Sequence, residues 1–527
     1  MLINIISARC IGIEAIPVTV EIDINGGIGI HLVGLADVAV KESLLRTVTA
    51  LQSLGFHIPG KKIVINLAPA DLHKKGSGYD LPIALGIIAA SGQVDLPGLG
   101  KYLIMGELGL DATLRPVPGA LPMAELARQM GLEGCILPET SAWEAADLSD
   151  LRVYGARNLT EVLGILGERE DCSRLLVTGK RLTFPVPPVR SGVMDFSEII
   201  GQESAKRGLE IAACAGHNAI LVGPPGAGKS SLAKALSGIL PPMSLEESLL
   251  TSKIFSVAGK GGGQCGLIRE RPFRAPHYSA SMAAIIGGGN GDNILPGEVS
   301  LATGGVLFLD EFAQMPKSVA EALRGPLEDR KVTISRLRAK IEYPASFMLV
   351  AASNPCPCGY WGEGDRCSCT PTQRQTYLGR LSGPILDRID IQLWLHPVDA
   401  RSLVGPEKGP RRETSAQIAR RVARVREIQR RRFAGEGIVT NAEMSNRQLA
   451  RFCPLSDACK ESMEKIISNM GLSARAYTRI LKVARTIADL EAVSAQPEGL
   501  PEPGPIEPRH LYEAAGYRFL DRQNIFG

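Results

Sequence analysis

The stretch Ala219–Leu240, AILVGPPGAGKSSLAKALSGIL, decides the fold of the middle of the chain. Ala219–Val222 is an apolar run typical of a buried strand, Gly223–Ser230 is a glycine-rich loop, and Ser231–Leu240 has the pattern of a helix. In this setting a G-x-x-x-x-G-K-S loop surrounds phosphates with backbone N–H groups at a helix N-terminus, and Lys229 would reach the outer phosphates. The stretch predicts a nucleoside triphosphate site on a parallel α/β sheet.

A second apolar run, Val306–Leu309, ends in two acids, Asp310 and Glu311. An acid at this place helps to hold Mg²⁺, so we assign Asp310 to the metal together with Ser230. We assign Glu311 as the general base that activates water for attack on the γ-phosphate. Two acids at a strand end are otherwise ordinary solvated charge, but this pair follows the loop within one α/β region. The residues assigned to nucleotide and Mg²⁺ are Gly223, Pro224, Pro225, Gly226, Ala227, Gly228, Lys229, Ser230, Ser231 and Asp310.

The length of 527 residues predicts several domains, because one ordinary core does not grow to that size. Residues 1–180 are rich in Gly, Ile and Val and predict a compact α/β domain, and 181–192 form a proline-bearing linker. Residues 193–400 alternate strand-like and helical runs, and 401–527 are mostly helical. The net charge of +4 neither demands nor excludes nucleic acid as a partner.

Neither a membrane span nor an export signal is expected. The longest apolar run, Leu81–Ala90, is half of the roughly 20 residues that a spanning helix needs. The apolar N-terminus lacks a basic lead-in and carries Glu14, Glu21 and Asp23, so it is typical of strands. Eleven cysteines without an export signal predict reduced thiols or bound metal, and a cytoplasmic location.

Four further motifs, in order along the chain, resemble the conserved boxes of AAA+ ATPases. Ile200–Gln202 looks like the adenine-side box, and Asn354 resembles the sensor 1 residue that orients the attacking water. Arg388 is similar to the arginine finger of the helix-2-insert branch, which includes magnesium chelatase and the MCM helicases, and Arg475 resembles sensor 2. Singly, such arginines are more often surface ion pairs. The resemblance implies a helical lid and a ring, expected to be a hexamer, in which the finger acts on the neighbouring subunit.

The match narrows to the ComM/YifB-type, magnesium-chelatase-like bacterial ATPases, which the chain resembles from end to end. The stretches that carry it are Gln202–Ala213, Arg271–His277, Asn354–Gly359 and Gly471–Leu490. The resemblance implies ATP and Mg²⁺ as cofactors, and single-stranded or branched DNA as the partner. It implies a hexameric branch-migration helicase that acts in recombination during natural transformation. The alternative is a chelatase-like or protein-remodelling motor that does not act on DNA.

Residues 1–170 resemble the Lon-type protease domain, mainly through Lys74–Asp80 and the segments after it. Lon enzymes use a serine nucleophile and a lysine base, and Gly78 and Pro122 stand at these two positions here. Ser77 is one residue away from the nucleophile's place. Since the nucleophile needs its base within hydrogen-bond reach, a scaffold or a DNA-channelling domain is preferred over a protease.

Residues 328–341 alternate apolar and basic side chains and predict a two-stranded hairpin with Ser335–Arg338 near its tip. In the helix-2-insert branch such a pre-sensor hairpin points into the pore of the ring, where basic residues would follow the phosphate backbone. An ordinary solvated hairpin fits the same pattern. The candidate DNA contacts are Lys331, Arg336, Arg338 and Lys340.

The arginine-rich stretch Arg411–Phe433 predicts a helix with one apolar face. The residues of that face are Ile418, Val422, Val425 and Ile428. Its arginines fall mainly on the outer side, and solvation or subunit contacts are favoured there over DNA.

Four cysteines form two closely spaced pairs, Cys356 with Cys358 and Cys367 with Cys369. Four thiolates satisfy tetrahedral zinc, and the glycines between the pairs allow the loop to fold back. Such a zinc ion would be structural, because four protein ligands leave no open position. The C-x-C pair is tighter than the usual C-x₂-C, so unliganded loop thiols remain the alternative.

Overall fold

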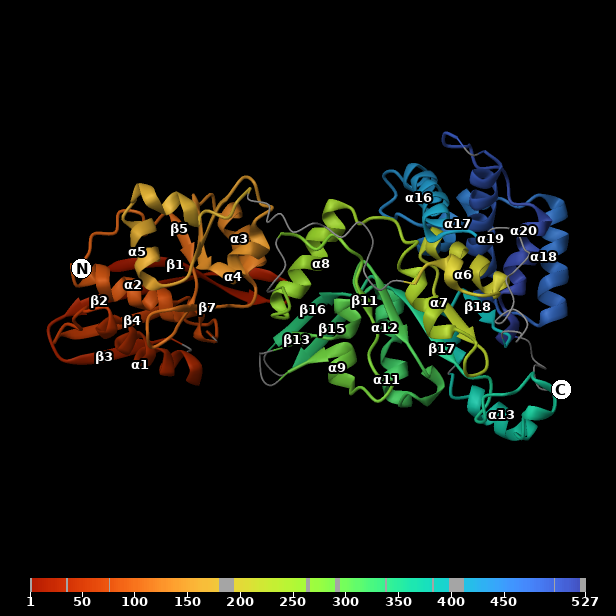
Figure 1. Ribbon diagram of the computed structural model, residues 1–527, viewed down its shortest axis with the longest axis horizontal. Helices are drawn as coiled ribbons and strands as arrows, with labels where there is room; N and C mark the ends of the chain where they lie inside the picture. The colour runs from red at the N-terminus through yellow and green to blue at the C-terminus, as the bar shows by residue number, and fades with distance from the viewer. Residues whose placement is uncertain are drawn as a thin grey trace.

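The computed structural model describes residues 2–34, 37–74, 76–179, 194–261, 266–289, 294–336, 339–381, 383–397, 412–496 and 498–521. Three parts follow one another along the long axis of the molecule: an N-terminal α/β domain, a central α/β domain and a group of C-terminal helices (Figure 1). Among the described residues, no helix combines the length and the apolar character needed to cross a membrane.

The N-terminal domain contains a mixed seven-stranded sheet in the order β3-β4-β2-β1-β5-β8-β9. Strands β1, β2 and β4 pair antiparallel, and the remaining neighbours pair parallel. The strands are β1 (Ile3–Ile11), β2 (Glu14–Asn25), β3 (Gly29–Val33), β4 (Lys62–Ala68), β5 (Tyr102–Ile104), β8 (Gly134–Pro138) and β9 (Arg152–Ala156). The main helices are α1 (Val38–Ser53), α2 (Asp80–Ala90), α3 (Ala120–Gln129) and α5 (Leu159–Leu166).

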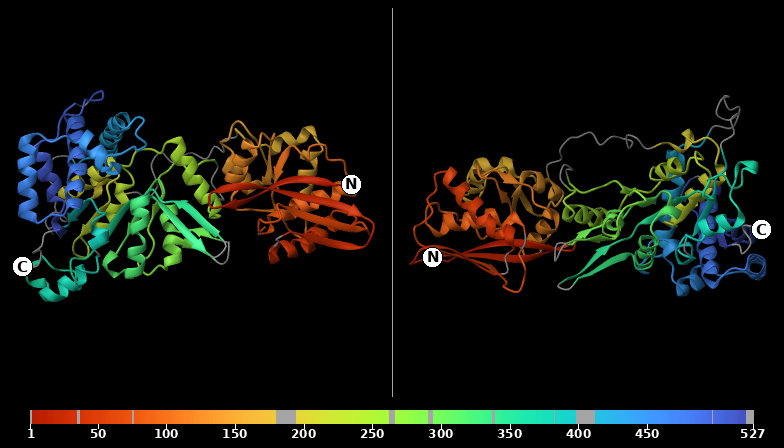
Figure 2. Two further views of the ribbon diagram at one scale, coloured as in Figure 1. Left: turned by 180° about the vertical axis from the view of Figure 1, so that it is seen from behind. Right: turned by 90° about the horizontal axis from the view of Figure 1, so that it is seen from below.

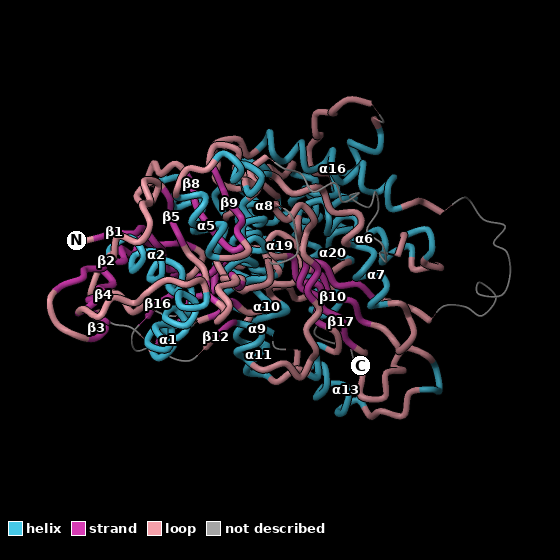
Figure 3. The backbone as a smooth tube through the Cα atoms, turned by 60° about the vertical axis from the view of Figure 1, so that its left-hand side comes forward, coloured by secondary structure: helices cyan, strands magenta, loops and turns pink. Residues whose placement is uncertain are grey.

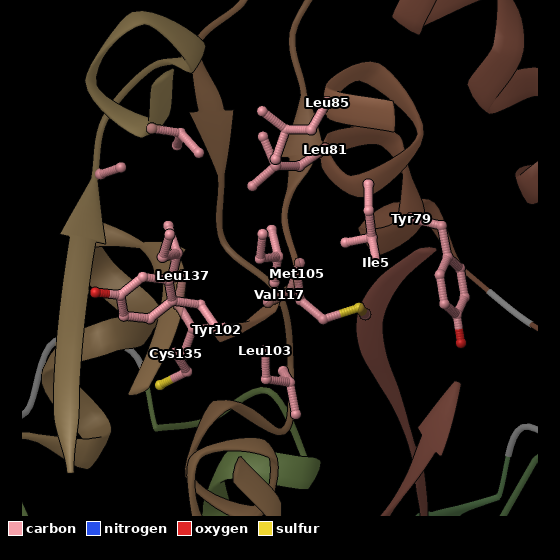
Figure 4. Packing of buried hydrophobic residues seen from close by; sticks show 14 of the residues in the cluster. Ile5, Tyr79, Leu81, Leu85, Tyr102, Leu103, Met105, Val117, Cys135 and Leu137 are labelled. Carbon is pink, nitrogen blue, oxygen red and sulfur yellow. The ribbon is translucent and has the colours of Figure 1, made fainter. Parts of the chain in front are cut away.

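The core of this domain forms where the alternating strands meet the apolar helix α2. Val18, Val20 and Ile22 on β2 are buried, as the period of two requires. Helix α2 is apolar on every side and lies inside the domain, so the longest apolar run of the sequence is a core helix. Figure 4 shows Leu81 and Leu85 of this helix near Ile5 of β1.

The central domain contains five parallel strands in the order β11-β14-β17-β10-β18. They are β10 (Ala219–Val222), β11 (Phe273–Arg274), β14 (Val306–Leu309), β17 (Met348–Ser353) and β18 (Ile391–Trp394). The parallel sheet predicted from the sequence is confirmed. Helix α7 (Lys229–Leu236) follows the glycine-rich loop and begins two residues earlier than Ser231, because Gly228 in the left-handed region is its N-cap.

Two hairpins of the central domain lie on the side that faces the N-terminal domain (Figure 2). The first, β12 (Gly287–Gly288) with β13 (Leu295–Pro296), lies between α9 (Met282–Ile286) and α10 (Glu298–Leu301), where a helix-2 insert is expected. The second, β15 (Lys331–Arg336) with β16 (Ala339–Pro344), is the predicted pre-sensor hairpin.

The C-terminal region is helical, as predicted, and Figure 3 shows its helices beside the central sheet. The buried face of α16 (Ser415–Arg432) is the predicted one, with Ile418, Val422, Val425 and Ile428 all in the core. That core is continuous with one face of the central sheet, so the helices pack on the ATPase-like sheet as a lid. The other long helices are α17 (Asn446–Phe452), α18 (Asp457–Met470), α19 (Ala474–Ala495) and α20 (Pro508–Gly516).

The N-terminal domain contacts the central domain at α8 (Leu245–Val257), at the pre-sensor hairpin and at residues 266–269, where Asp147 accepts from the backbone N–H of Leu267 at 2.9 Å. On α8, the carbonyl of Ser256 accepts from the backbone N–H of Gly119 at 2.9 Å, and Lys253 pairs with Glu125. In the turn between β1 and β2, a Cβ added to Gly12 would lie 3.2 Å from Cγ2 of Ile341 on β16. The N-terminal domain therefore contacts both a helix and the pre-sensor hairpin.

Candidate active site

Three neighbouring strands bring the predicted catalytic motifs together. In the sheet, Val222 at the end of β10 pairs with Ser353 of β17, and Leu309 at the end of β14 pairs with Ala351. Because the carboxyl ends of parallel strands lie at one edge, the segments that follow these strands meet there. The segments are the glycine-rich loop, the two acids after β14, and Asn354 after β17.

The glycine-rich loop has the geometry of a phosphate cradle. Gly226 and Gly228 have φ values of +80° and +87°, in the left-handed region that glycine adopts at little cost. No side chain among the described residues caps the N-terminus of α7, so the N–H groups of its first turn face the loop. These groups and the dipole of the helix fit an anionic phosphate.

Lys229 is the central hydrogen-bond donor of the site. Its Nζ donates to the carbonyls of Gly223 and Pro224 at 2.6 and 2.9 Å, and to Oδ1 of Asn354 at 2.9 Å. Burial lowers the pKa of the Lys229 ammonium, and the charges of Asp310 and Glu311 oppose that shift. The lysine assigned to phosphate and the residue assigned to sensor 1 are thus in direct contact.

Ser230 and the two acids form a second group of oxygens beside the lysine. The Ser230 hydroxyl donates to Oδ2 of Asp310 at 2.9 Å, and Oδ1 of Asp310 accepts from the backbone N–H of Glu311 at 2.9 Å. Hydroxyl and carboxylate oxygens are the ligands that Mg²⁺ prefers, so this pair fits the assigned metal role. Glu311 has φ +49°, a value in the left-handed region that is strained for a residue other than glycine. Strained backbone of this kind is concentrated at functional sites.

A cavity of about 790 Å³ adjoins the loop on the side expected for the base of the nucleotide. The Gln202 side-chain amide donates to the carbonyls of Ala227 in the loop and His396, at 3.2 and 2.6 Å. Gln202 thereby joins the predicted adenine-side box to the phosphate loop. The aromatic residues that line the cavity are Trp361, Trp394, Tyr517 and Phe519.

These aromatic residues were missed by sequence reasoning. Trp394 belongs to none of the motifs, and Tyr517 and Phe519 lie near the C-terminal end of the sequence. Only the fold places these three residues at the cavity. Trp361 did have a signal, because it is one of three tryptophans in the chain and lies between the two cysteine pairs.

The two candidate arginines, Arg388 and Arg475, belong to one charged cluster. Arg388 is 8 % exposed and pairs with Glu328, while Arg475 donates to Oδ2 of Asp387 at 3.0 Å. The hydrogen bond and charge of Arg388, and then the charge of Arg475, lower the pKa of Glu328. The structure thus places both arginines near Glu328, each in an ion pair with an acid.

The four cysteines of the two C-x-C pairs are brought together. Their ligand atoms all lie within 4.8 Å of one another, and Sγ of Cys356 is 3.3 Å from that of Cys358 and 3.8 Å from that of Cys367. A tetrahedron with Zn–S bonds of about 2.3 Å has sulfur atoms about 3.8 Å apart, so the cluster fits zinc. Cys453 and Cys459, in contrast, are buried in the hydrophobic core.

The pre-sensor hairpin exposes one polar face. Val332, Ile334 and Ile341 are buried, while Lys331 and Lys340 are exposed on the opposite face. The charge of Lys331 is partly offset by Glu342, at 3.1 Å between Nζ and Oε2. For Arg336 only the backbone is described, in β15, and Arg338 lies outside the described residues.

In the protease-like region of the N-terminal domain, a side chain at Gly78 would displace the flexible end of Met105. A Cβ there would lie 2.7 Å from Cε of Met105. The Ser77 hydroxyl donates to the Glu107 carboxylate, and Pro122 is buried in α3. This arrangement agrees with the absence of a serine–lysine dyad at the expected positions.

Comparisons with known proteins agree with this architecture. Residues 195–403 match the family model described as magnesium chelatase, subunit ChlI. Two related models match as well: subunit ChlI of Mg-chelatase over residues 20–141, and its C-terminal part over 412–518. Competence protein ComM of Haemophilus influenzae is 43% identical over 520 residues, which cover 98% of this chain and 97% of that protein. Uncharacterized protein YifB of Salmonella typhimurium is 41% identical over 513 residues, which cover 97% and 96%.

Proposed function

The chain belongs to the ComM/YifB-type, magnesium-chelatase-like family of AAA+ ATPases, and on that premise we propose that it couples ATP hydrolysis to movement along DNA. The active form is a hexameric branch-migration helicase that acts in the cytoplasm on single-stranded or branched DNA, in recombination during natural transformation. The name of the relative in Haemophilus influenzae, competence protein ComM, supports the link to natural transformation. The observation on this chain that carries it is the pre-sensor hairpin, whose exposed face presents Lys331 and Lys340.

Each residue of the site has one task in hydrolysis. The N–H groups of the loop and Lys229 bind the phosphates, and Ser230 with Asp310 would hold Mg²⁺, which neutralises charge on the phosphate oxygens. Glu311 takes the proton of the attacking water. Asn354 orients that water from the end of β17, where its contact with Lys229 fixes its side chain.

Arg388 is assigned to the neighbouring subunit's site. The transition state spreads negative charge over the γ-phosphoryl oxygens, and an inserted guanidinium raises the rate by about 10³ or more. Within the chain Arg388 pairs with Glu328 in the cluster that also holds Arg475, away from the contacts of Lys229. Arg388 is 8 % exposed in this pair, whereas the Arg475 side chain beside it is exposed.

The cysteine cluster is proposed to hold a structural zinc ion. The support is the spacing of the sulfur atoms, which matches a tetrahedral site. The ion would fix the segment that follows Asn354.

The decisive experiment is the ATPase rate measured without DNA and with single-stranded, duplex and branched DNA. We expect stimulation by DNA, and weaker DNA affinity with a smaller salt dependence for the double variant Lys331→Gln, Lys340→Gln. Lys460→Gln, which removes an exposed lysine paired with Asp457 on α18, is the matched control and should bind DNA normally. ATP hydrolysis that no DNA stimulates, with no DNA binding, would favour the chelatase-like or protein-remodelling alternative.

A further inference from the structure

The loop that carries the four cysteines lies directly on the phosphate loop. Gly359, between the two pairs, has φ +86°, and a Cβ there would lie 2.8 Å from Cδ of Pro225 and 3.0 Å from its Cγ. Both the backbone conformation and the close approach therefore require glycine at this position. The contact joins the cysteine loop to the segment that binds phosphate.

The same loop also forms part of the wall of the cavity on the base side. The rings of Trp361 and Trp394 meet edge to face with centroids 5.4 Å apart, and Trp394 meets Phe519 in the same way at 5.6 Å. Gly362, with φ +94°, lets the backbone approach the Trp394 ring, because a Cβ there would lie 3.1 Å from its Cζ2. All three aromatic residues line the cavity. The cysteine loop thus contacts both ends of the nucleotide site.

This loop contains little regular secondary structure. Within residues 356–369, all of which the structure describes, the only regular element is the short 3₁₀ turn Gly364–Arg366, and no side chain caps it. Three glycines with positive φ make the loop costly to order, because glycine loses the most backbone entropy. The cluster of four sulfur atoms brings the two ends of the loop together, beside local contacts such as the Arg366–Glu363 ion pair and the stacking of Arg366 on Tyr360.

We propose that metal bound by Cys356, Cys358, Cys367 and Cys369 controls the affinity for ATP. Ligation of the four thiolates holds Gly359 on Pro225 and keeps Trp361 in the wall of the base cavity. Loss of the metal frees both contacts, and ATP binds more weakly. Trp361 is the positioning residue through which the metal site acts on the base. This inference rests on the proposed ATP site and the proposed zinc ion.

The test measures zinc content and nucleotide affinity on the same full-length preparations. Zinc per chain is measured by mass spectrometry. The Kd of mant-ATP is measured by energy transfer from tryptophan in a Trp143→Phe background, which removes the tryptophan of the N-terminal domain. The variants are Cys358→Ser and Cys367→Ser, with Cys10→Ser as the control for loss of a thiol in the N-terminal domain. Trp361→Ala removes an aromatic ring from the wall of the base cavity without changing a metal ligand.

Both cysteine variants should lose zinc and bind mant-ATP about tenfold more weakly or worse, since stacking of a base on an aromatic ring is worth that much. Cys10→Ser should match the parent protein in both measurements. Trp361→Ala should keep its zinc and still weaken binding by about tenfold. A chelator should reproduce the loss in the parent protein, and added Zn²⁺ should restore the original Kd.

A folded, zinc-free protein that binds mant-ATP with the parent Kd overturns the proposal, as does a purified parent protein without metal. If the cysteine variants do not fold, unchanged affinity in Trp361→Ala overturns it instead. A parent protein that binds no mant-ATP at all is a different failure, because it removes the ATP site on which the proposed function rests.

Discussion

At the scale of single residues, the active site joins side chains that lie far apart in the sequence. Chemistry fixes both the residue type and its place after a strand for Lys229, Asp310, Glu311 and Asn354. The hydrogen bond from Lys229 to Asn354, however, joins residues 125 positions apart. Only the order of β10, β14 and β17 in the sheet brings them together, and a single sequence does not reveal strand order.

Glu311→Gln should bind ATP and fail to hydrolyse it. The amide keeps the shape of the side chain but cannot accept the proton of the attacking water, so kcat should fall by about 10²- to 10⁴-fold. ATP affinity should be retained or rise, because a negative charge near the phosphates is removed. Steady-state hydrolysis and equilibrium ATP binding measure the two effects.

The control for this variant is Glu321→Gln, which changes an exposed glutamate on α11 (Lys317–Ala322) that pairs with Lys317. It should hydrolyse ATP at the normal rate. Normal turnover by Glu311→Gln would remove this residue from the role of general base.

Glu144 should make the contact between the domains weaker as the pH rises. It is buried where the N-terminal domain meets α8, it accepts from the Ser256 hydroxyl, and burial raises its pKa from 4.5 to about 7. The folded protein therefore favours the neutral acid. The stability from this group is fully present below pH 4.5 and is lost as the pH rises through about 7, by about 3 kcal/mol in all.

Glu144→Gln should remove this pH dependence, because its amide stays neutral. Unfolding midpoints of the parent and the variant, measured from pH 4.5 to pH 8.5, should converge at the acid end and diverge in favour of the variant at the alkaline end. Parallel curves for the two proteins would show that Glu144 does not titrate at the domain contact.

At the scale of elements, periodicity predicts which face of a helix is buried but not which charges it pairs. The apolar face of α16 is the predicted one. The expectation of outward, solvated arginines is correct for Arg420, Arg430 and Arg431, which are exposed. It is wrong for Arg421 and Arg432, which pair with Glu210 and with Asp489. A long side chain next to the apolar face reaches neighbouring helices, whose positions the sequence does not give.

Arg432→Ala should destabilise the C-terminal lid by about 1.5–3 kcal/mol. The guanidinium pairs with both oxygens of Asp489, at 2.7 and 2.6 Å, and Asp489 is fully buried. Asp489 keeps Arg485 as a second ion-pair partner at 3.0 Å, so the variant loses two charge-assisted hydrogen bonds inside a buried cluster, which costs more than losing an exposed pair. Denaturant unfolding of the variant measures this loss.

Arg430→Ala is the matched control on the same helix, since Arg430 is 74 % exposed in its pair with Glu427. The control should lose less than about 1 kcal/mol. Equal decreases in the free energy of unfolding for Arg430→Ala and Arg432→Ala would mean that the buried ion pair stabilises the lid no more than the exposed one.

At the scale of the whole molecule, composition predicts three successive parts and the P-loop predicts the parallel sheet of the second. The way the parts meet is not predictable, because the contacts between α3 and α8 join segments that carry no motif. The sequence likewise does not predict that the β15–β16 hairpin lies on the side of the central domain toward the N-terminal domain (Figure 1).

Mixing two inactive variants should restore ATPase activity if Arg388 acts on a neighbouring subunit. Lys229→Ala removes the phosphate-binding lysine, and Arg388→Ala removes the finger, so each alone should be inactive. In a ring mixed at equal amounts, about one half of the sites keep the lysine and about one half of those meet an intact finger. About a quarter of the parent rate is therefore expected.

The mixing experiment uses ATP hydrolysis as its readout, after subunit exchange has been verified by light scattering or tagged copies. Verified exchange with no recovery of activity would place Arg388 in its own subunit's site.

The contact of Gly12 with Ile341 couples the free energy of the N-terminal domain to that of the pre-sensor hairpin. Any ligand that displaces the β15–β16 hairpin changes the free energy of this contact. Linkage is reciprocal, so whatever the N-terminal domain holds at the β1–β2 turn biases the hairpin by the same amount. Binding at either domain would therefore change affinity at the other, through a turn in which Gly12 has φ +62° and lies close to the hairpin.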